Sequence, residues 1–235
     1  MTAGPAWTCA LRCRPPRTRN LVRVLLAFDT STPAVTVALH DGERVVASHT
    51  VVDARRQGEL LAPGITSVLD EAWVPRQDVT AIAVGVGPGP FTGLRVGLVT
   101  ARTLALALEV PVYGVCTLDV LAVQAVDEGA VDGPFLVATD ARRKEVYWAS
   151  YDGQGVRLDG PHVARPADVA TDLPVVGAGA LLYPEAFPHA VGPVHPDAGV
   201  LARVVTDERA ELLDPEPLYL RRPDVAAPVK PKPVS

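Results

Sequence analysis

The sequence predicts an α/β protein built from two unequal copies of one lobe. Near the N-terminus, and again from Pro134, a short apolar run ends in an aspartate, turns, and continues as a second strand. Apolar segments of strand and helix length then follow in the order βββαβαβα, which is typical of a mixed sheet with helices on its faces. The 235 residues suffice for a buried core in one or two domains.

The first half of the chain alternates strand and helix patterns. Alternating apolar positions and an Asp-Gly turn predict strands over 22–28, 34–39, 44–52, 81–86 and 112–115. Helical spacing of apolar residues predicts helices over 59–73, 93–108 and 118–126.

The second half repeats the pattern in shorter form. The segment 134–151 reads as a strand ending at Asp140, a basic turn and a second strand, and later segments predict a strand over 173–176 and a helix over 198–206. We therefore expect an N-terminal lobe over 21–128 and a C-terminal lobe over 129–222. A disordered extension over 1–20 and a Pro-rich, extended tail over 223–235 flank them.

The composition of the chain argues against several classes of protein. The chain is 48% hydrophobic and 21% charged, and the first 23 residues hold five arginines and no acid, which leaves about −10 of formal charge on the rest. Such a body does not resemble a phosphate-binding surface. Three cysteines without a CxxC pair predict neither disulfides nor a metal site. Arg23 and Asp29 interrupt the first apolar run, so we expect no signal peptide, and a cytoplasmic location.

A glycine-rich loop lies at the centre of the first half, in the stretch AIAVGVGPGPFTGLRVGLVTARTLALAL (81–108). Gly87 and Gly89 precede a helix, so their backbone N–H groups could bind an anion; equally, they could only permit a tight turn and close packing. Thr92 is a plausible N-cap. Arg95 in the first turn opposes the helix dipole, so we expect an acidic partner in a salt bridge there.

The helix after this loop is apolar on all sides, which indicates cover on more than one side. Its small residues recur every fourth position and would let another helix approach closely. With two arginines in sixteen residues it is too short and too charged to span a bilayer. Together with the helix over 59–73, it predicts a partner interface, packing within the chain being the alternative. The interface residues would be Leu60, Leu61, Ile65, Leu69, Gly93, Gly97, Ala101 and Ala105.

Five blocks of sequence, in this order, resemble the TsaB (YeaZ) family of bacterial tRNA threonylcarbamoyladenosine biosynthesis proteins: LLAFDTSTPAVTVAL, VGVGPGPFTGLRVGLVTARTLA, PVYGVCTLDVLA, TDARRKEVYWASY and LYLRRPDV. The resemblance spans about 24–225. It implies a two-lobed actin-like ATPase fold (ASKHA, RNase H-like) with a reduced second lobe. It also implies work with the sister protein TsaD and the ATPase TsaE, which transfer a threonylcarbamoyl group to the adenosine beside the anticodon of tRNAs reading codons that begin with A.

The resemblance also bears on the site residues. TsaD has an HxxxH metal-binding pair where this chain has Thr117 and Leu121, and family members often have His-Ser-Glu where this chain has Gln57-Gly58-Glu59. It therefore implies no catalytic residue, no metal and no bound cofactor here. Asp29 and Asp140 end the strands where catalytic members hold metal and nucleotide, and we expect them to be structural or vestigial.

The resulting hypothesis is a non-catalytic subunit that forms a heterodimer with TsaD, helps to bind TsaE, self-associates when alone and meets tRNA only through the complex, with no membrane contact. The alternative is an independent phosphotransferase or metallopeptidase-like enzyme of the same fold. A third possibility is direct tRNA binding by Arg142, Arg143 and Lys144. The competing interpretation is that these residues form a hairpin turn whose charges are solvated or ion-paired.

Overall fold

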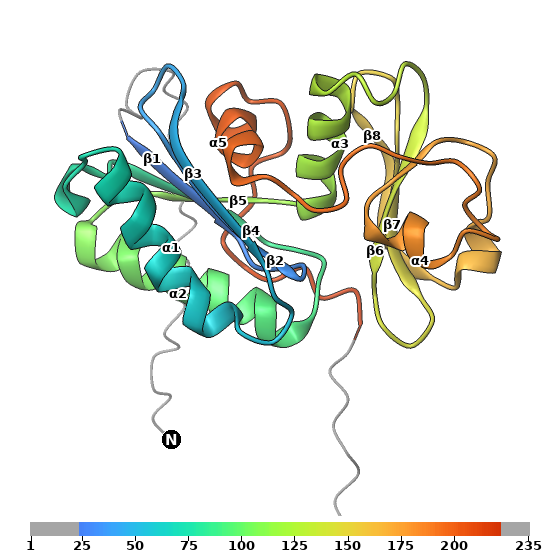
Figure 1. The fold of residues 1–235 in the computed structure, drawn as a ribbon, viewed down its shortest axis with the longest axis horizontal. Helices are drawn as coiled ribbons and strands as arrows, with labels where there is room; N and C mark the ends of the chain where they lie inside the picture. Colours follow the sequence, from blue (N-terminus) through green and yellow to red (C-terminus); the bar gives the residue numbers. More distant parts are fainter. Residues whose placement is uncertain (1–23, 222–235) are drawn as a thin grey trace, which may run out of the picture.

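The computed structural model describes residues 24–221, which form two five-stranded sheets, one in each lobe (Figure 1). In each sheet the first strand along the chain lies in the middle, with the second and third strands on one side and the fourth and fifth on the other. This duplicated order is that of the two-lobed actin-like ATPase fold, so the predicted fold class is confirmed. The predicted extension over 1–20 and the tail over 223–235 lie outside the described residues.

The first sheet has the strand order β3-β2-β1-β4-β5. Strand β1 pairs antiparallel with β2 and parallel with β4. Every residue of β1, β2 and β4 is buried, because helices cover both faces of the sheet. The strands are β1 (Leu25–Asp29), β2 (Ala34–His40), β3 (Val45–Val52), β4 (Ala81–Gly85) and β5 (Val112–Val115).

Helices α1 (Gln57–Glu71) and α2 (Phe91–Leu108) lie together on one face of this sheet (Figure 1). Their apolar residues form one core cluster with Leu26 and Phe28 of β1. The alternate residues of β1 point to the other face, where they pack against α3 (Thr117–Asp127) and α5 (Ala198–Thr206). A 3-10 turn, η1 (Arg76–Asp78), leads into β4.

The second sheet repeats this arrangement with shorter elements. Strand β6 pairs antiparallel with β7 and parallel with β9, as β1 does with β2 and β4. Strand β8, which the sequence did not predict, extends the sheet beside β7. The elements are β6 (Phe135–Asp140), β7 (Val146–Tyr151), β8 (Arg157–Ala164), η2 (Pro166–Val169), β9 (Val175–Val176), α4 (Ala178–Leu182) and β10 (Ala190–Val191).

Helix α5 has the bounds that the sequence predicts, but it returns to the first sheet. Its apolar side packs against β1 and β2, and the Ala198 amide donates a hydrogen bond to Thr36 Oγ1 at 2.9 Å. The expected C-terminal lobe over 129–222 therefore contains a helix that completes the core of the N-terminal lobe.

Helix α2 has 18 residues, two more than predicted, and among the described residues it is the helix long and apolar enough to cross a membrane by length and composition, contrary to the expectation from the sequence. A third of this segment is buried within the chain, and Arg95 and Arg102 are exposed on it. The helix packs on its own sheet with one side and presents a partly apolar surface with the other.

Candidate functional site

The aspartate at the end of β1 is held by its own chain. Asp29 is completely buried; its Oδ1 accepts hydrogen bonds from the backbone N–H and the hydroxyl of Ser31, both at 2.6 Å, and its Oδ2 accepts one from the Thr117 hydroxyl at 2.7 Å. Burial raises the pKa of Asp29, and the hydrogen bonds from Ser31 and Thr117 oppose that rise. Both carboxylate oxygens thus have partners within the fold.

The glycine loop closes over this aspartate. A Cβ atom at Gly85 would overlap Asp29 Oδ2, and one at Gly89 would overlap the carbonyl oxygen of Ser31. Gly87 has a left-handed φ of 91°, and its amide donates a hydrogen bond to Thr117 Oγ1 at 3.2 Å. These glycines serve close backbone packing, and the Gly87 N–H already has an acceptor that an anion would have to replace.

The first turn of α2 differs from its prediction. The helix begins at Phe91, Pro90 is at the N-cap position, and Thr92 is an exposed residue inside the first turn. Arg95 does not meet the acidic partner expected for it. Its guanidinium lies 3.7 Å from the centroid of the Phe91 ring, and its Nε donates to the Tyr219 hydroxyl at 3.3 Å. An aromatic ring and a phenol stabilise this cation.

The small-residue stripe of α2 faces its own chain, which corrects the expectation that it faces a partner. A Cβ atom at Gly93 would overlap the carbonyl oxygen of Thr30, and one at Gly97 would lie 2.6 Å from Thr30 Oγ1. Ala101 and Ala105 are buried in the core cluster beneath the helix. The stripe lets α2 approach the sheet and the loop after β1.

The predicted interface residues of α1 also pack against their own chain. Leu61 and Ile65 are buried in the core beneath the helix, so they are unavailable to a partner in this conformation. Leu60 and Leu69 are partly buried and pack at the margin of the same core. The sequence identified the apolar side of α1, and that side covers the sheet.

A partly apolar surface remains on the side of α2 that points away from the sheet. We define the outer face of α2 by Arg95, Val99, Arg102, Thr103 and Leu106, all of which are exposed. Val99 is 61% exposed and Leu106 is 82% exposed. Helix α1 packs beside α2 (Figure 1), so the two helices present a shared outward surface. Exposed apolar side chains in such a place mark a candidate binding surface.

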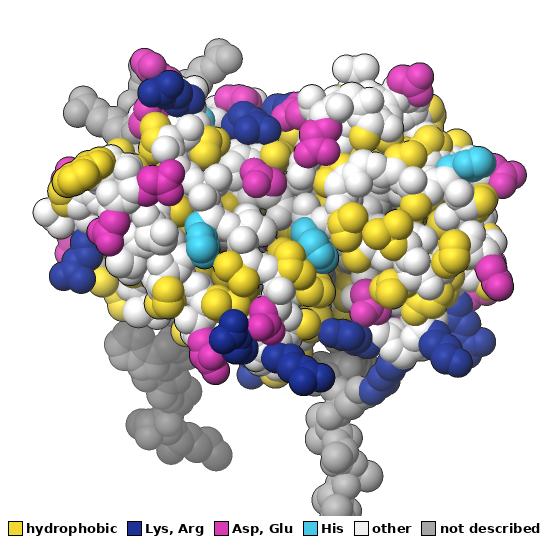
Figure 2. Space-filling view, viewed as in Figure 1, with side chains coloured by type: hydrophobic (Ala, Val, Ile, Leu, Met, Phe, Trp, Pro, Cys, Tyr) yellow, Lys and Arg dark blue, Asp and Glu magenta, His cyan; other side chains and the backbone are white. Residues whose placement is uncertain are grey.

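The two lobes enclose a pocket of about 320 Å³ between the loop after β1 and α4. Its wall includes Asp140, whose Oδ1 accepts the Arg142 amide at 2.7 Å, and the exposed side chains of Leu181 and Leu182. Figure 2 shows hydrophobic side chains gathered over this part of the second lobe. Burial lowers the pKa of His195 at the same pocket, so its imidazole is neutral near pH 7.

The described residues do not assemble a metal site. Across 24–221, no group of three or more His, Cys, Asp or Glu residues is placed to hold a metal ion. Thr117 and Leu121, at the positions that the resemblance aligned with a histidine pair, are both buried at the start of α3. Thr117 contributes a hydroxyl to the Asp29 network instead of a metal ligand.

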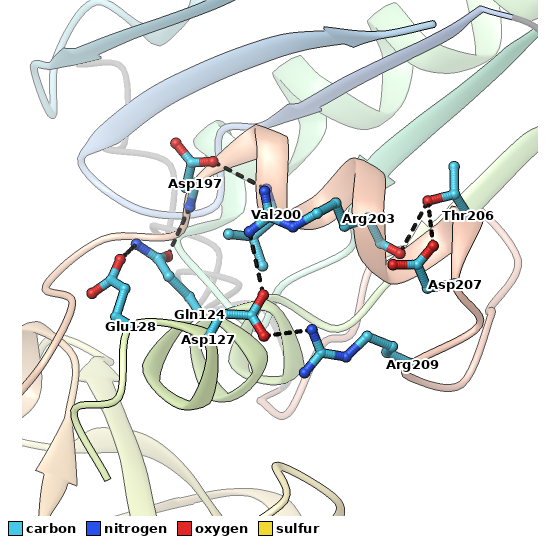
Figure 3. Close-up of polar contacts among 9 residues, drawn as sticks. All are labelled: Gln124, Asp127, Glu128, Asp197, Val200, Arg203, Thr206, Asp207 and Arg209. Atoms are coloured by element: carbon cyan, nitrogen blue, oxygen red, sulfur yellow. Dashed lines mark hydrogen bonds and ion pairs between the residues drawn. The ribbon is translucent and has the colours of Figure 1, made fainter. Parts of the chain in front are cut away.

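Helix α3 takes part in two polar clusters that the sequence did not reveal. In the first, Asp127 of α3 pairs with Arg203 at 3.3 Å and Arg209 at 2.5 Å (Figure 3). In the second, the buried carboxylate of Asp119 accepts a hydrogen bond from the Tyr151 hydroxyl at 2.7 Å. Burial raises the pKa of Asp119, and the nearby Arg157 opposes the rise. Periodicity could not reveal these contacts, because the partners are far apart in sequence.

Comparisons of sequence and structure with known proteins point to one family. A sequence model described as TsaD, tRNA N6-adenosine threonylcarbamoyltransferase, matches residues 50–178, more than half of the chain. An uncharacterized protein of Mycobacterium tuberculosis is 44% identical over 216 residues, which cover 88% of this chain and 95% of that protein.

Relatives with an informative name agree. The Escherichia coli tRNA threonylcarbamoyladenosine biosynthesis protein TsaB is 40% identical over 128 residues, 54% of each chain. The solved structure of YeaZ from Pseudomonas aeruginosa is 35% identical and superposes with a TM-score of 0.71, covering 84% of this chain and 99% of that one. A shared fold and a shared sequence over most of the chain lead to one conclusion: this chain belongs to the TsaB (YeaZ) family.

Proposed function

We propose that this chain is a non-catalytic partner subunit of TsaD in the synthesis of threonylcarbamoyladenosine on tRNA. Relatives named for that biosynthesis support the process, and the match of residues 50–178 to the TsaD family supports kinship with the transferase itself. In this proposal the group is transferred to the adenosine beside the anticodon of tRNAs reading codons that begin with A.

The observation that carries the proposal is the outer face of α2. Val99 and Leu106 are exposed on a helix whose opposite side is already packed against its own sheet. Burying a leucine or valine contributes about 1.5–3 kcal/mol, so leaving both in water is unfavourable for an isolated monomer. A helix pair of TsaD that packs on this face and on α1 would bury them, and without TsaD a second copy of this chain would do so.

The chemistry of the lobes supports a non-catalytic role. The carboxylate of Asp29 is engaged by Ser31 and Thr117, and a side chain at Gly85 would collide with it. A phosphotransferase or metallopeptidase would need a carboxylate or histidine set that is open to a metal or a nucleotide. The residues between 24 and 221 offer no group of metal ligands.

The wider assembly is part of the same proposal. TsaE would bind the surface that the dimer forms, and tRNA would reach this chain through the complex. The location is the cytoplasm, where tRNA is modified, and no membrane is involved. The arginines on the outer face of α2 support that view, since each would cost about 2.5–3.5 kcal/mol at the centre of a bilayer.

A reconstitution tests the proposal. Purified TsaD and TsaE are mixed with ATP, the threonylcarbamoyl donor and an unmodified tRNA transcript, with and without this chain, and the modified nucleoside is quantified by mass spectrometry. We expect product only when the chain is present together with TsaD. Equal product without the chain, or product from the chain alone, contradicts the proposal.

A further inference from the structure

A groove crosses the junction of the two lobes beside the N-terminal end of α2. Its volume is about 410 Å³, within the range of pockets that bind small organic molecules. We call it the basic groove and define it by Pro90, Phe91, Arg142, Arg143, Tyr219 and Arg221. It brings together the glycine loop, the basic turn between β6 and β7, and the segment 218–221, which lie far apart in sequence.

One wall of the basic groove is an aromatic platform. The rings of Phe91 and Tyr219 are stacked with their centroids 5.4 Å apart at 24°, and each residue is 39% exposed. The Arg95 guanidinium lies over the Phe91 ring, and its Nε donates to the Tyr219 hydroxyl at 3.3 Å, so this cation contacts both residues of the platform. The platform is fixed to the fold, because the Leu218 amide donates to the Val86 carbonyl at 2.9 Å.

The turn between β6 and β7 contributes cationic side chains to the lining. Arg142, Arg143 and Lys144 have φ values of 61°, 55° and 59°, so three consecutive basic residues occupy left-handed conformations in one tight turn. The Arg142 side chain is 62% exposed while it contacts Asp140 at 3.4 Å. Arg221 donates to the Ala141 carbonyl at 3.0 Å and pairs with Glu145, which fixes the third arginine beside this turn.

The lining of the basic groove is rich in arginine, although the chain carries a formal charge of −5. Three arginines line it and none of the described residues that line it is acidic, while Asp140 and Glu145, beside the lining, pair with Arg142 and Arg221. Burial and the charge of Arg143 lower the pKa of Arg221, as expected where guanidinium groups crowd together. Figure 2 shows Lys and Arg side chains gathered along the lower edge of the molecule, below the line between the lobes.

We propose that the basic groove binds a single-stranded segment of the tRNA substrate. One base stacks on Tyr219, and the adjoining phosphates contact Arg142, Arg143 and Arg221. Single-stranded nucleic acid is bound by this combination, a cationic track for the backbone beside aromatic rings for the bases. An acidic protein segment would pair with the arginines but would leave the aromatic platform without a partner. The inference rests on the proposed function only in naming tRNA as the RNA.

Two variants and a matched control test it. Arg142→Gln removes one exposed cation, Tyr219→Ala removes one ring of the aromatic platform, and Arg76→Gln removes an exposed arginine at the other end of β4. Each full-length variant is mixed with TsaD, and binding of a labelled tRNA transcript is measured by fluorescence anisotropy between 50 and 200 mM salt. Thermal melts and co-elution with TsaD show that the variants are folded and assembled.

We expect Tyr219→Ala to weaken tRNA binding about fivefold or more. Arg142→Gln should reduce the slope of log K against log salt by about 0.7, the value for one phosphate contact on a single strand, and Arg76→Gln should change neither quantity. Wild-type affinity and salt slope in both groove variants overturn the inference. So does loss of TsaD or TsaE binding with tRNA affinity intact, which makes the groove a protein-binding site.

The two proposals fail separately. If the wild-type complex modifies tRNA while the groove variants bind it like the wild type, only the groove assignment is wrong. If the chain does not promote modification but the groove variants still lose RNA affinity, only the proposed function is wrong.

Discussion

At Gly93, α2 passes so close to the loop after β1 that a single added carbon would overlap the Thr30 carbonyl oxygen. Two effects therefore compete in Gly93→Ala. Alanine favours the helix by about 1 kcal/mol, while overpacking against a backbone atom costs about 1–3 kcal/mol. We expect packing to dominate and the melting temperature to fall by a few degrees, at about 2–4 °C per kcal/mol.

Gly133→Ala is the matched control, because a Cβ atom there meets nothing within 4 Å. Differential scanning calorimetry of both variants checks the prediction. A Gly93→Ala variant as stable as Gly133→Ala would mean that α2 is not held against the loop as described.

The buried carboxylate of Asp29 makes stability depend on pH. Burial raises its pKa above the ordinary 3.8, so the folded state binds its proton more tightly than the unfolded state. The contribution of Asp29 to stability is therefore complete below pH 3.8 and is lost as the pH rises through the folded-state pKa. We expect the free energy of unfolding of the wild type, relative to Asp29→Asn, to fall as the pH is raised above 3.8.

Asp41→Asn provides the contrasting control for urea titrations at each pH. Backbone hydrogen bonds from Arg44 and Glu43 lower the pKa of the exposed Asp41, so its contribution is lost only as the pH falls below the ordinary range. The difference between the wild type and Asp41→Asn should stay constant from pH 5 to 8. A constant difference for Asp29→Asn from pH 3.8 upward would contradict the raised pKa of this carboxyl group.

At the scale of elements, the outer face of α2 predicts a separation of binding from stability. Leu106 is mostly exposed, so Leu106→Lys should change the free energy of unfolding of the isolated chain by less than about 0.5 kcal/mol. Within the proposed interface the same lysine would be buried without a partner, and we expect co-elution with TsaD on a sizing column to be lost.

Leu158→Lys is the control, since Leu158 is an exposed leucine on β8 in the other lobe. It should leave co-elution unchanged. If Leu106→Lys still co-elutes with TsaD, the outer face of α2 is not the interface. Substitutions such as Gly97→Leu would not decide the matter, because they disturb the monomer core first.

Local patterns predicted most elements but not what covers them. Apolar spacing located the helix at 198–206 with its observed bounds and the strands that end at Asp29 and Asp140. Strand β8 was missed because alternation in it is weak and Gly160-Pro161 interrupts it. The small-residue stripe of α2 was assigned to a partner chain. Periodicity shows which side of a helix carries small residues, but it does not show which neighbour packs there. In the structure that neighbour is Thr30, from another part of the same chain.

The candidate site was likewise predicted only in part. The resemblance placed Thr117 where a metal ligand would be, but its hydrogen bond to Asp29 spans 88 residues and leaves no local signal. The stacking of Tyr219 on Phe91 was equally hidden, which is why Arg95 was assigned an acidic partner.

For the whole molecule, the return of α5 predicts that the lobes do not fold independently. A fragment of residues 24–128 lacks α5, so only α3 would remain to cover the face of the first sheet formed by Leu25, Ala27 and Ala38. We expect this fragment to unfold without a cooperative transition and to bind a hydrophobic dye, while residues 24–221 melt cooperatively. A sharp thermal transition in the short fragment, followed by circular dichroism, would contradict this.

Because α5 returns to the first sheet, that sheet cannot be completed until most of the chain has been synthesised. The hydrogen bond between the Ala198 amide and the Thr36 hydroxyl joins residues 162 positions apart. At about 5–20 residues per second, a ribosome needs roughly 8–32 s to add the second partner after the first. During that interval the apolar side chains that α5 covers stay exposed, and such exposed surface on a partly made sheet favours aggregation.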